Sequence, residues 1–334
     1  MDRRITTLDS LRGIAALSVV LYHYTSRFRV KFGHDFSSVY DFKLGFYGVE
    51  LFFIISGFVI FMTVEQCKDG YEFAFKRLTR LYPTYWLCLL ISFTFLYFIG
   101  LDSPKPTIAE FLINLTMIQH LLHTQSVDGV YWSLLPELLF YLMIFLLAQF
   151  NAIKKIYIWG GVWLAASIIS SSLNLYYHDS FLKYAGLFYT GVIFYKIYSG
   201  ENTFQNHLMV IICYLIVLLN FRAEVYSIPA ITLIYLLFYG FVFHKLKFLN
   251  VRILRFMGLI SYPLYLLHQE IGYTIMLYLR TFIKDGPLVI IIPLLITVAL
   301  ASVVSIYFEK PIIKAARAFL ESKIIFLNRY RLAK

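Results

Sequence analysis

The stretch TTLDSLRGIAALSVVLYHYTSRF, residues 6–28, combines a membrane-spanning pattern with two ionisable side chains. Residues 14–22 form an almost unbroken apolar run, yet Arg12 precedes it and His23 follows it. In one helix these two residues share nearly the same face, about 16 Å apart along the axis. Ionisable residues inside membrane helices are costly to bury and usually face a bundle interior or a functional path. The stretch therefore predicts a retained membrane helix with a polar stripe.

The composition of the whole chain predicts a polytopic membrane protein. Of 334 residues, 60% are hydrophobic and 15% are charged, and the mean hydropathy is +0.72. At about 20–25 residues for each span and its loop, the chain holds roughly ten spans. Hydropathy predicts an all-α bundle within residues 1–309 and a basic amphipathic cytoplasmic tail at 310–334. The spans are expected near 8–28, 44–65, 81–100, 132–149, 156–174, 183–198, 207–221, 226–244, 256–280 and 287–308.

The net charge of +11 follows the predicted topology. With the N-terminus inside, about 20 Lys and Arg residues fall on the inner side and about nine on the outer side. This asymmetry predicts cytoplasmic termini and argues against a nucleic-acid partner. Cys67, Cys88 and Cys213 have no paired spacing and are expected to pack in the bundle. No HxxxH or HxxE pair falls on one helix turn, so no metal site is expected.

A second polar stripe lies in YWSLLPELLFYL, residues 131–142, where Ser133, Glu137 and Tyr141 share a helical face. Glu137 is predicted at a depth similar to that of His23, where a carboxylate can orient an imidazole. Alternatively, Glu137 only stabilises the helix start after Pro136.

His268 is a second intramembrane histidine, and it shares a face with Ser261 and Tyr265. Such groups often only join helices by hydrogen bonds. Arg12 and His23 also have a purely structural interpretation. In it, Arg12 extends its charged group to the membrane surface and His23 is a hydrogen-bonded core histidine. Residues 111–123, in the outer connection at 101–131, are too short to span and suggest a re-entrant or interfacial helix.

Arg77 and Arg80 lie three positions apart at the predicted inner end of the third span. The positive-inside rule alone accounts for such a pair. Forked guanidinium donors beside the aromatic rings of Tyr82 and Trp86 would also suit the phosphates and the base of a nucleotide cofactor.

Six segments in this order resemble the membrane acyltransferase 3 family of bacterial multi-pass proteins. They are LRGIAALSVVLYHY (11–24), GVELFFIISGFVI (48–60), RLTRLYPTYW (77–86), YWSLLPELLFYL (131–142), ISYPLYLLHQ (260–269) and YFEKPI (307–312). The resemblance implies O-acylation, mostly O-acetylation, of cell-envelope glycans such as O-antigen or exopolysaccharide at the inner membrane. It also implies acetyl-CoA as acyl donor.

The resemblance implies roles for individual residues. The family's first-span arginine and histidine fall on Arg12 and His23, the histidine being regarded as essential for acyl transfer. Its RxxR motif falls on Arg77 and Arg80, which are expected to contact the acyl-CoA. Its acidic second-span position is Glu50 here, often Asp in the family. Glu137 matches the fourth-span glutamate. Trp132, Ser133 and His268 are candidate substrate or support residues.

Two mechanisms follow from these roles. His23 acts either as a general base, with Glu137 orienting its ring, or as a nucleophile that briefly carries the acyl group. The sequence includes no SGNH-like domain of the kind that many family members append. We therefore expect the membrane domain to finish the transfer alone or to pass the acyl group to a separate periplasmic partner. A proton-coupled transporter, an acyl-translocating subunit and a structural scaffold are the rival interpretations.

Overall fold

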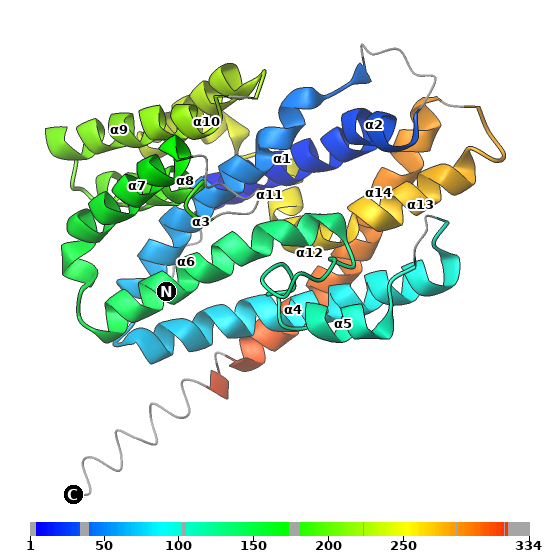
Figure 1. The fold of residues 1–334 in the computed structure, drawn as a ribbon, viewed down its shortest axis with the longest axis horizontal. Coiled ribbons are helices and arrows are strands. Elements are labelled where there is room, and N and C mark those ends of the chain that lie inside the picture. Colours follow the sequence, from blue (N-terminus) through cyan, green and yellow to red (C-terminus); the bar gives the residue numbers. More distant parts are fainter. Residues whose placement is uncertain are drawn as a thin grey trace, which may run out of the picture.

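The computed structural model describes residues 5–33, 40–101, 105–173, 181–222, 224–284, 286–316 and 318–319, and these residues form helices without a strand (Figure 1). The α-helices are α1 (Thr6–Tyr22), α2 (Phe28–Phe32), α3 (Gly48–Val64), α4 (Gly70–Ile99), α5 (Ile108–Asn114), α6 (Leu134–Gln149), α7 (Ile156–Ser172), α8 (Ala185–Tyr198), α9 (Phe204–Asn220), α10 (Ser227–Val242), α11 (Arg252–Leu259), α12 (Ser261–Leu267), α13 (Gln269–Leu279) and α14 (Pro287–Val304).

Short 3-10 and π segments extend several of these helices. The 3-10 segments are η3 (Lys43–Tyr47), η4 (Gly129–Ser133), η5 (Ile153–Lys155) and η6 (Lys247–Leu249), and the π segments are η1 (His23–Arg27) and η7 (Ser305–Glu309). With these extensions, each of the ten predicted spans coincides with helical structure. Four helical stretches are long and apolar enough to cross a bilayer by themselves, namely Lys43–Val64, Gly70–Ile99, Gly129–Gln149 and Pro287–Ala316. The all-α membrane bundle is confirmed.

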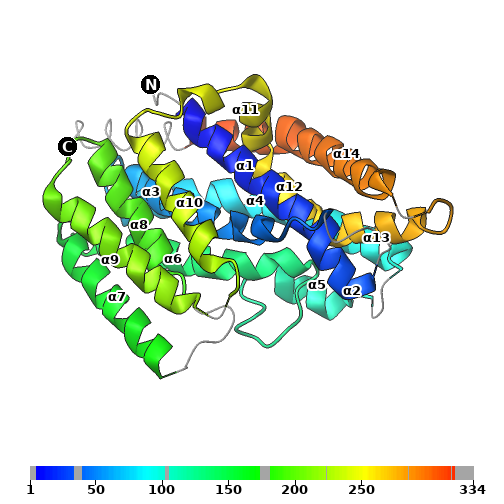
Figure 2. The same ribbon diagram turned by 90° about the horizontal axis from the view of Figure 1, so that it is seen from above.

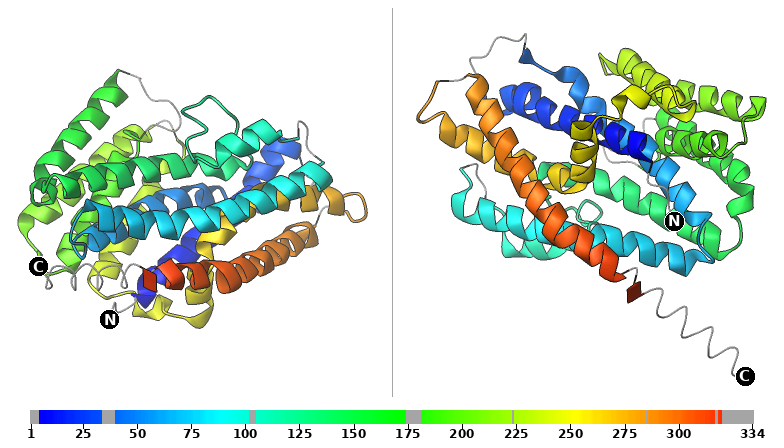
Figure 3. Two further views of the ribbon diagram at one scale, coloured as in Figure 1. Left: turned by 90° about the horizontal axis from the view of Figure 1, so that it is seen from below. Right: turned by 180° about the vertical axis from the view of Figure 1, so that it is seen from behind.

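α3 lies at the centre of the bundle, with 78% of its most apolar window buried. Seen from above, α7 to α10 gather on one side and α13 and α14 on the other, with α1 between them (Figure 2). α14 packs against α12 and α13 and runs along the rear of the molecule (Figure 3). The helices that carry the candidate site residues therefore converge on the middle of the fold.

Two glycine contacts bring helices unusually close. A Cβ added to Gly57 of α3 would meet the backbone carbonyl of Phe188, and one added to Gly191 of α8 would meet that of Ile54. Gly13 of α1 and Gly258 of α11 approach each other's helices in the same way. Small residues allow such backbone approach in membrane bundles, where dispersion rather than water exclusion drives packing. These contacts position α3 and α1 against their neighbours.

Two helices differ from the predicted spans. α4 begins at Gly70, earlier than residue 81, because Asp69 caps it by accepting a hydrogen bond from the Glu72 backbone N–H at 2.8 Å. The prediction from hydropathy left out the first turns of α4 because they carry charged residues. The segment 256–280 is divided into α11, α12 and α13, with a break at His268.

The predicted short helix in the outer connection is α5, which begins with a capping box formed by Thr107 and Glu110. The chain that follows α5 lies against α4, where Tyr85 Oη donates to the Asn114 carbonyl at 2.7 Å. Tyr85 is fourteen residues before the end of α4 at Ile99, roughly 20 Å along the axis. These contacts hold the chain after α5 against the side of α4.

The three cysteines are free, and Cys88 and Cys213 are buried, in agreement with a packing role. The predicted tail at 310–334 lies mostly outside the described residues.

Candidate active site

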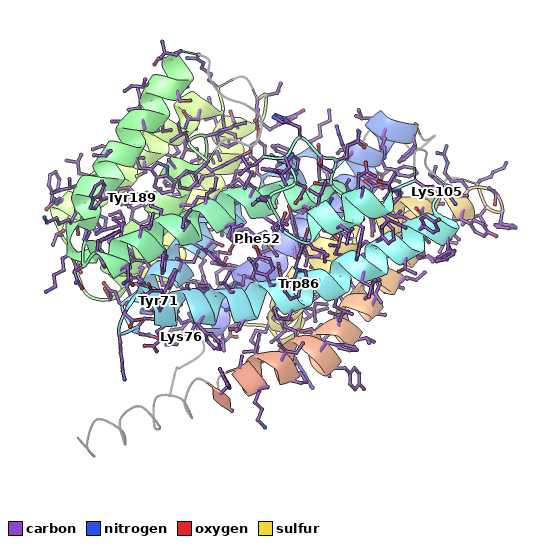
Figure 4. All side chains as sticks on the ribbon, turned by 60° about the horizontal axis from the view of Figure 1, so that its bottom comes forward. Phe52, Tyr71, Lys76, Trp86, Lys105 and Tyr189 are labelled. Carbon is purple, nitrogen blue, oxygen red and sulfur yellow. The ribbon has the colours of Figure 1, made fainter. Side chains whose placement is uncertain are left out.

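A cavity of about 120 Å³ lies where α1, α3, α4, α6 and α12 meet. Of the predicted site residues, Arg12, Arg77, Arg80, Ser133 and Glu137 line it. Figure 4 shows Phe52, another lining residue, in the interior of the bundle near α4 and α6. Segments separated by more than a hundred residues in the sequence thus contribute to one polar chamber.

The three cavity arginines differ in their surroundings. Arg77 is buried at 5% exposure, and its Nη2 donates to the Val59 carbonyl at 3.0 Å and to the Thr63 hydroxyl near the end of α3. Arg80 is exposed, and Arg12 is half-buried. Arg77 therefore joins α4 to α3 through one nitrogen, while Arg80 and Arg12 present charge to the cavity.

Glu137 is held on the cavity wall by two hydroxyl groups. Its Oε1 accepts hydrogen bonds from Ser56 at 2.9 Å and from Tyr141 at 2.8 Å. Ser133, Glu137 and Tyr141 all line the cavity, so the predicted shared face is confirmed. The predicted partnership with His23 is replaced, because the hydrogen bonds of Glu137 go to α3 and to its own helix.

The sequence reasoning missed several cavity residues. Glu309 of η7 lines the chamber at 8% exposure, and its Oε2 is buried without a hydrogen bond to the described residues. Tyr262 and Tyr265 of α12 line it as well. The YFEKPI and ISYPLYLLHQ segments contained these residues, but no pattern on one helix indicated that they would meet Arg12. The cavity thus holds three arginines and two glutamates.

His23 and His268 form a pair outside this cavity. Nδ1 of His23 lies 2.9 Å from Nε2 of His268, and the ring centroids are 4.9 Å apart. His268 is completely buried, whereas His23 is half-buried. The sequence singled out both residues but did not pair them. His268 takes the place next to His23 that the sequence analysis gave to Glu137.

Irregular backbone geometry positions both histidines. His23 begins the π segment η1, and His268 stands between α12 and α13. π turns inside α-helices often occur at functional sites, because they turn a side chain away from the regular helical face. At the second irregularity, Tyr24 Oη donates to the His268 carbonyl at 2.8 Å. The pair thus depends on two local departures from α-helical geometry.

Glu50 and Trp132 lie near the cavity but do not line it. Glu50 is 1% exposed in the first turn of α3, and its Oε2 makes no hydrogen bond within the described residues. The Trp132 ring lies 5.7 Å from the Tyr184 ring and 6.4 Å from that of Phe53, a cavity residue. Trp132 thus supports the cavity wall.

Tyr82 and Trp86 form hydrogen bonds to the chain that follows α5. Tyr82 Oη donates to the Thr116 carbonyl at 3.0 Å, and Trp86 Nε1 donates to the Leu115 carbonyl at 2.9 Å. Trp86 lies along α4 between Lys76 and the end of the helix near Lys105 (Figure 4). Both side chains hold the chain after α5 against α4, and neither is among the residues that line the cavity.

No group of three or more His, Cys, Asp or Glu side chains within the described ranges is arranged to hold a metal ion. The candidate site consists of an arginine-rich cavity, in which Glu137 is held by hydrogen bonds, and of a histidine pair outside it. Tyr265 connects these two regions. Its ring lines the cavity, and its carbonyl lies 2.8 Å from Nδ1 of His268.

Comparison with known proteins identifies relatives of this chain. A putative acetyltransferase, ORF330, of Acidianus two-tailed virus is 26% identical over 203 residues, covering 58% of this chain and 58% of that protein. Protein 2 in the picA locus of Rhizobium radiobacter is 37% identical over 111 residues, covering 30% of this chain and 52% of that protein. The O-acetyltransferase OatA of Staphylococcus aureus strain NCTC 8325 / PS 47 is 29% identical over 103 residues, covering 28% and 15%.

The chain thus spans 58% or less of the length of these relatives. No solved structure matches it significantly. A family model described as an acyltransferase domain matches residues 5–308, nearly the whole of the helical bundle. The protein is therefore a multi-pass membrane protein that belongs to the acyltransferase 3 family.

Proposed function

We propose that this protein is a membrane O-acyltransferase that moves an acetyl group from acetyl-CoA to a hydroxyl of a cell-envelope glycan. The family supports acyl transfer. The observation that carries the finer proposal is the cavity, in which Arg12 and Arg80 offer cationic groups beside the polar wall formed by Glu137 and Tyr141. We place the reaction in the bacterial inner membrane, with O-antigen or exopolysaccharide as the acceptor class.

The arginines suit the phosphate groups of CoA. Guanidinium groups form charge-assisted, often forked hydrogen bonds to phosphate oxygens. Arg80 is exposed, which supports its contact with a donor that enters from the cytosol, whereas Arg77 is partly occupied by its contacts with α3. The apolar wall of the chamber, which includes Phe52 and Phe53, then accommodates the pantetheine arm.

The histidine pair suits the proton transfer that the reaction requires. As the acceptor hydroxyl attacks the thioester carbonyl, His23 takes the hydroxyl proton, the C–O ester bond forms and the C–S bond breaks. The proton then passes to the leaving thiolate, which departs as CoA thiol. His23 is half-buried, whereas His268 is fully buried, which supports His23 rather than His268 as the group that meets the acceptor. We favour His23 as general base over a covalent acyl-histidine, because direct transfer needs no acyl intermediate exposed to water.

The test is acetyl-CoA turnover by the purified protein in nanodiscs, measured as thiol release and as transfer of labelled acetyl to a bacterial glycan extract. Wild type is compared with His23→Ala, Arg80→Gln and the control Arg252→Gln, which changes an exposed arginine outside this cavity. We expect release to require His23 and the Arg80 change to raise KM, with the control unchanged. Equal release by all variants, or none by wild type, would favour the transporter interpretation instead.

A further inference from the structure

The hydrogen bonds of His268 identify the nitrogen that carries its proton. Nδ1 of His268 lies 2.8 Å from the Tyr265 carbonyl and 3.2 Å from the Leu264 carbonyl. A carbonyl oxygen can only accept, so the proton of this ring must sit on Nδ1. In the neutral ring Nε2 then carries a lone pair, and that lone pair faces His23.

The same reasoning assigns the tautomer of His23. Its Nδ1 lies 3.0 Å from the Val19 carbonyl and 2.9 Å from Nε2 of His268, and both partners are acceptors. Nδ1 of His23 therefore carries a proton and shares it between them. The reverse arrangement, with His268 donating, would point a bare nitrogen of His23 at the Val19 carbonyl. Nε2 of His23 is thus the unprotonated nitrogen.

His268 is itself fixed in place by its surroundings. It is 0% exposed, and its carbonyl accepts from the Gly272 backbone N–H at 2.9 Å and from Tyr24 Oη at 2.8 Å. Tyr24 also lies 3.3 Å from the Thr297 hydroxyl of α14. Three helices therefore set the height and angle at which the imidazole of His268 meets His23.

We propose that His268 is a positioning residue, which fixes the tautomer and ring orientation of His23 so that His23 Nε2 is the base. This inference deepens the proposed function and rests on it for its catalytic meaning. A base must be unprotonated on the nitrogen that faces its substrate, and a partner on the other nitrogen sets the tautomer. When Nε2 takes the hydroxyl proton, the positive ring donates more strongly from Nδ1 to Val19 and His268.

Tyr265 connects this pair to the donor cavity. Its hydroxyl bonds to Ser133 at 2.7 Å on the cavity wall, while its carbonyl accepts from His268. This arrangement gives Ser133 and His268, both predicted as substrate or support residues, defined positions in one chain of contacts.

The test compares two substitutions of His268 whose side chains differ in length, so that only one can reach His23. The Oε1 of Gln in His268→Gln can accept near the position of the histidine Nε2, whereas the amide of His268→Asn ends near the position of Nδ1 and does not reach His23. We expect His268→Asn to lower kcat about tenfold or more with KM for acetyl-CoA unchanged, and His268→Gln to restore kcat to within about threefold of wild type. Thermal stability in nanodiscs is measured for both variants.

A second arm tests non-additivity. In the His23→Ala background, adding His268→Asn should lower the residual rate no further, because a positioning residue acts only through the base it positions. Equal kcat for the Asn and Gln variants at similar stability would overturn the inference. So would a full additional loss in the double variant, or an effect confined to KM.

A third readout does not depend on activity. Solid-state NMR of protein with 15N-labelled histidine, with His23 and His268 assigned from the loss of signals in His23→Ala and His268→Asn, reports which nitrogen is protonated. We expect both rings to carry the proton on Nδ1. A protonated Nε2 on neutral His23 would overturn the inference even in an active enzyme. If wild type shows these tautomers but releases no CoA, the proposed function is wrong, while the contact by which His268 positions His23 still holds.

Discussion

The two ends of α1 contribute to two different sites, an arginine-rich cavity at Arg12 and a histidine pair at His23. At the Arg12 end, regular helices bring charged and polar side chains from α1, α4 and α6 to one cavity. At the His23 end, two neutral imidazole rings share a hydrogen bond. Their positions depend on the π turn η1 and on the break before α13. Charge suits a site that recognises an anionic donor, whereas fixed geometry suits proton transfer. The following predictions test this contrast.

The largest effect is expected at the histidine end. Replacing His23 with alanine should lower acyl transfer by about 10²- to 10⁴-fold, the usual contribution of a positioned general base. Donor affinity, measured by titration with a non-hydrolysable CoA thioether, should change less than twofold. A loss of donor binding equal to the loss of rate would mean that His23 belongs to the cavity and that the two ends are one site.

The next effect is expected at the arginine end. Arg80→Gln should raise KM for acetyl-CoA by tenfold or more with little change in kcat, because a hydrogen bond to a charged group contributes about 1.5–3 kcal/mol. Arg80→Lys should retain part of this affinity, because it keeps the charge but loses the fork. Steady-state kinetics separate the two constants. A fall in kcat at constant KM would contradict donor recognition by Arg80.

A smaller effect is expected where the cavity wall holds its carboxylate. Tyr141→Phe removes one of the two hydroxyl groups that donate to Glu137 Oε1, so the remaining Ser56 contact should limit the loss in kcat/KM to roughly tenfold. Ser56→Ala should have a similar effect, and the two changes together should exceed their sum if they hold one conformation. Kinetics of the three variants measure this, and additive losses would contradict the shared role.

Tyr24→Phe should affect only the histidine end. It removes the 2.8 Å hydrogen bond to the His268 carbonyl, worth about 0.5–1.5 kcal/mol, and should lower kcat by two- to tenfold. KM for acetyl-CoA should stay within experimental error, as a KM series in the same nanodiscs would measure. A change in KM instead would show that the contact communicates with the donor cavity.

The smallest effect should come from ionic strength. Raising salt from about 50 to 500 mM shortens the Debye length from roughly 14 Å to about 4 Å, which weakens attraction between an exposed arginine and phosphate. KM for the donor should rise two- to threefold in wild type and less in Arg80→Gln. The ratio of kcat between wild type and His268→Asn should not change with salt, because that contact is buried.

Much of this organisation could be predicted from residue patterns. Periodicity placed Ser133, Glu137 and Tyr141 on one face, and all three line the cavity. Hydropathy located ten helical segments, although it missed the charged first turns of α4. Pairing between helices could not be predicted in this way, since nothing local to Glu137 indicates Ser56 and nothing local to His23 indicates His268. For the same reason the pattern did not indicate that Tyr82 and Trp86, close to Arg80 in the sequence, bind the chain that follows α5.

The sequence by itself determined that this protein resides in a membrane and is helical, and it identified the residues able to carry charge or a proton within the membrane. Those properties follow from composition and from a period of 3.6, which are local. The tertiary structure decided which of these residues act together, because close glycine contacts and helix irregularities set where side chains from distant segments meet. Arg12 and His23 share a helix, yet the fold gives one to a donor cavity and the other to a histidine pair.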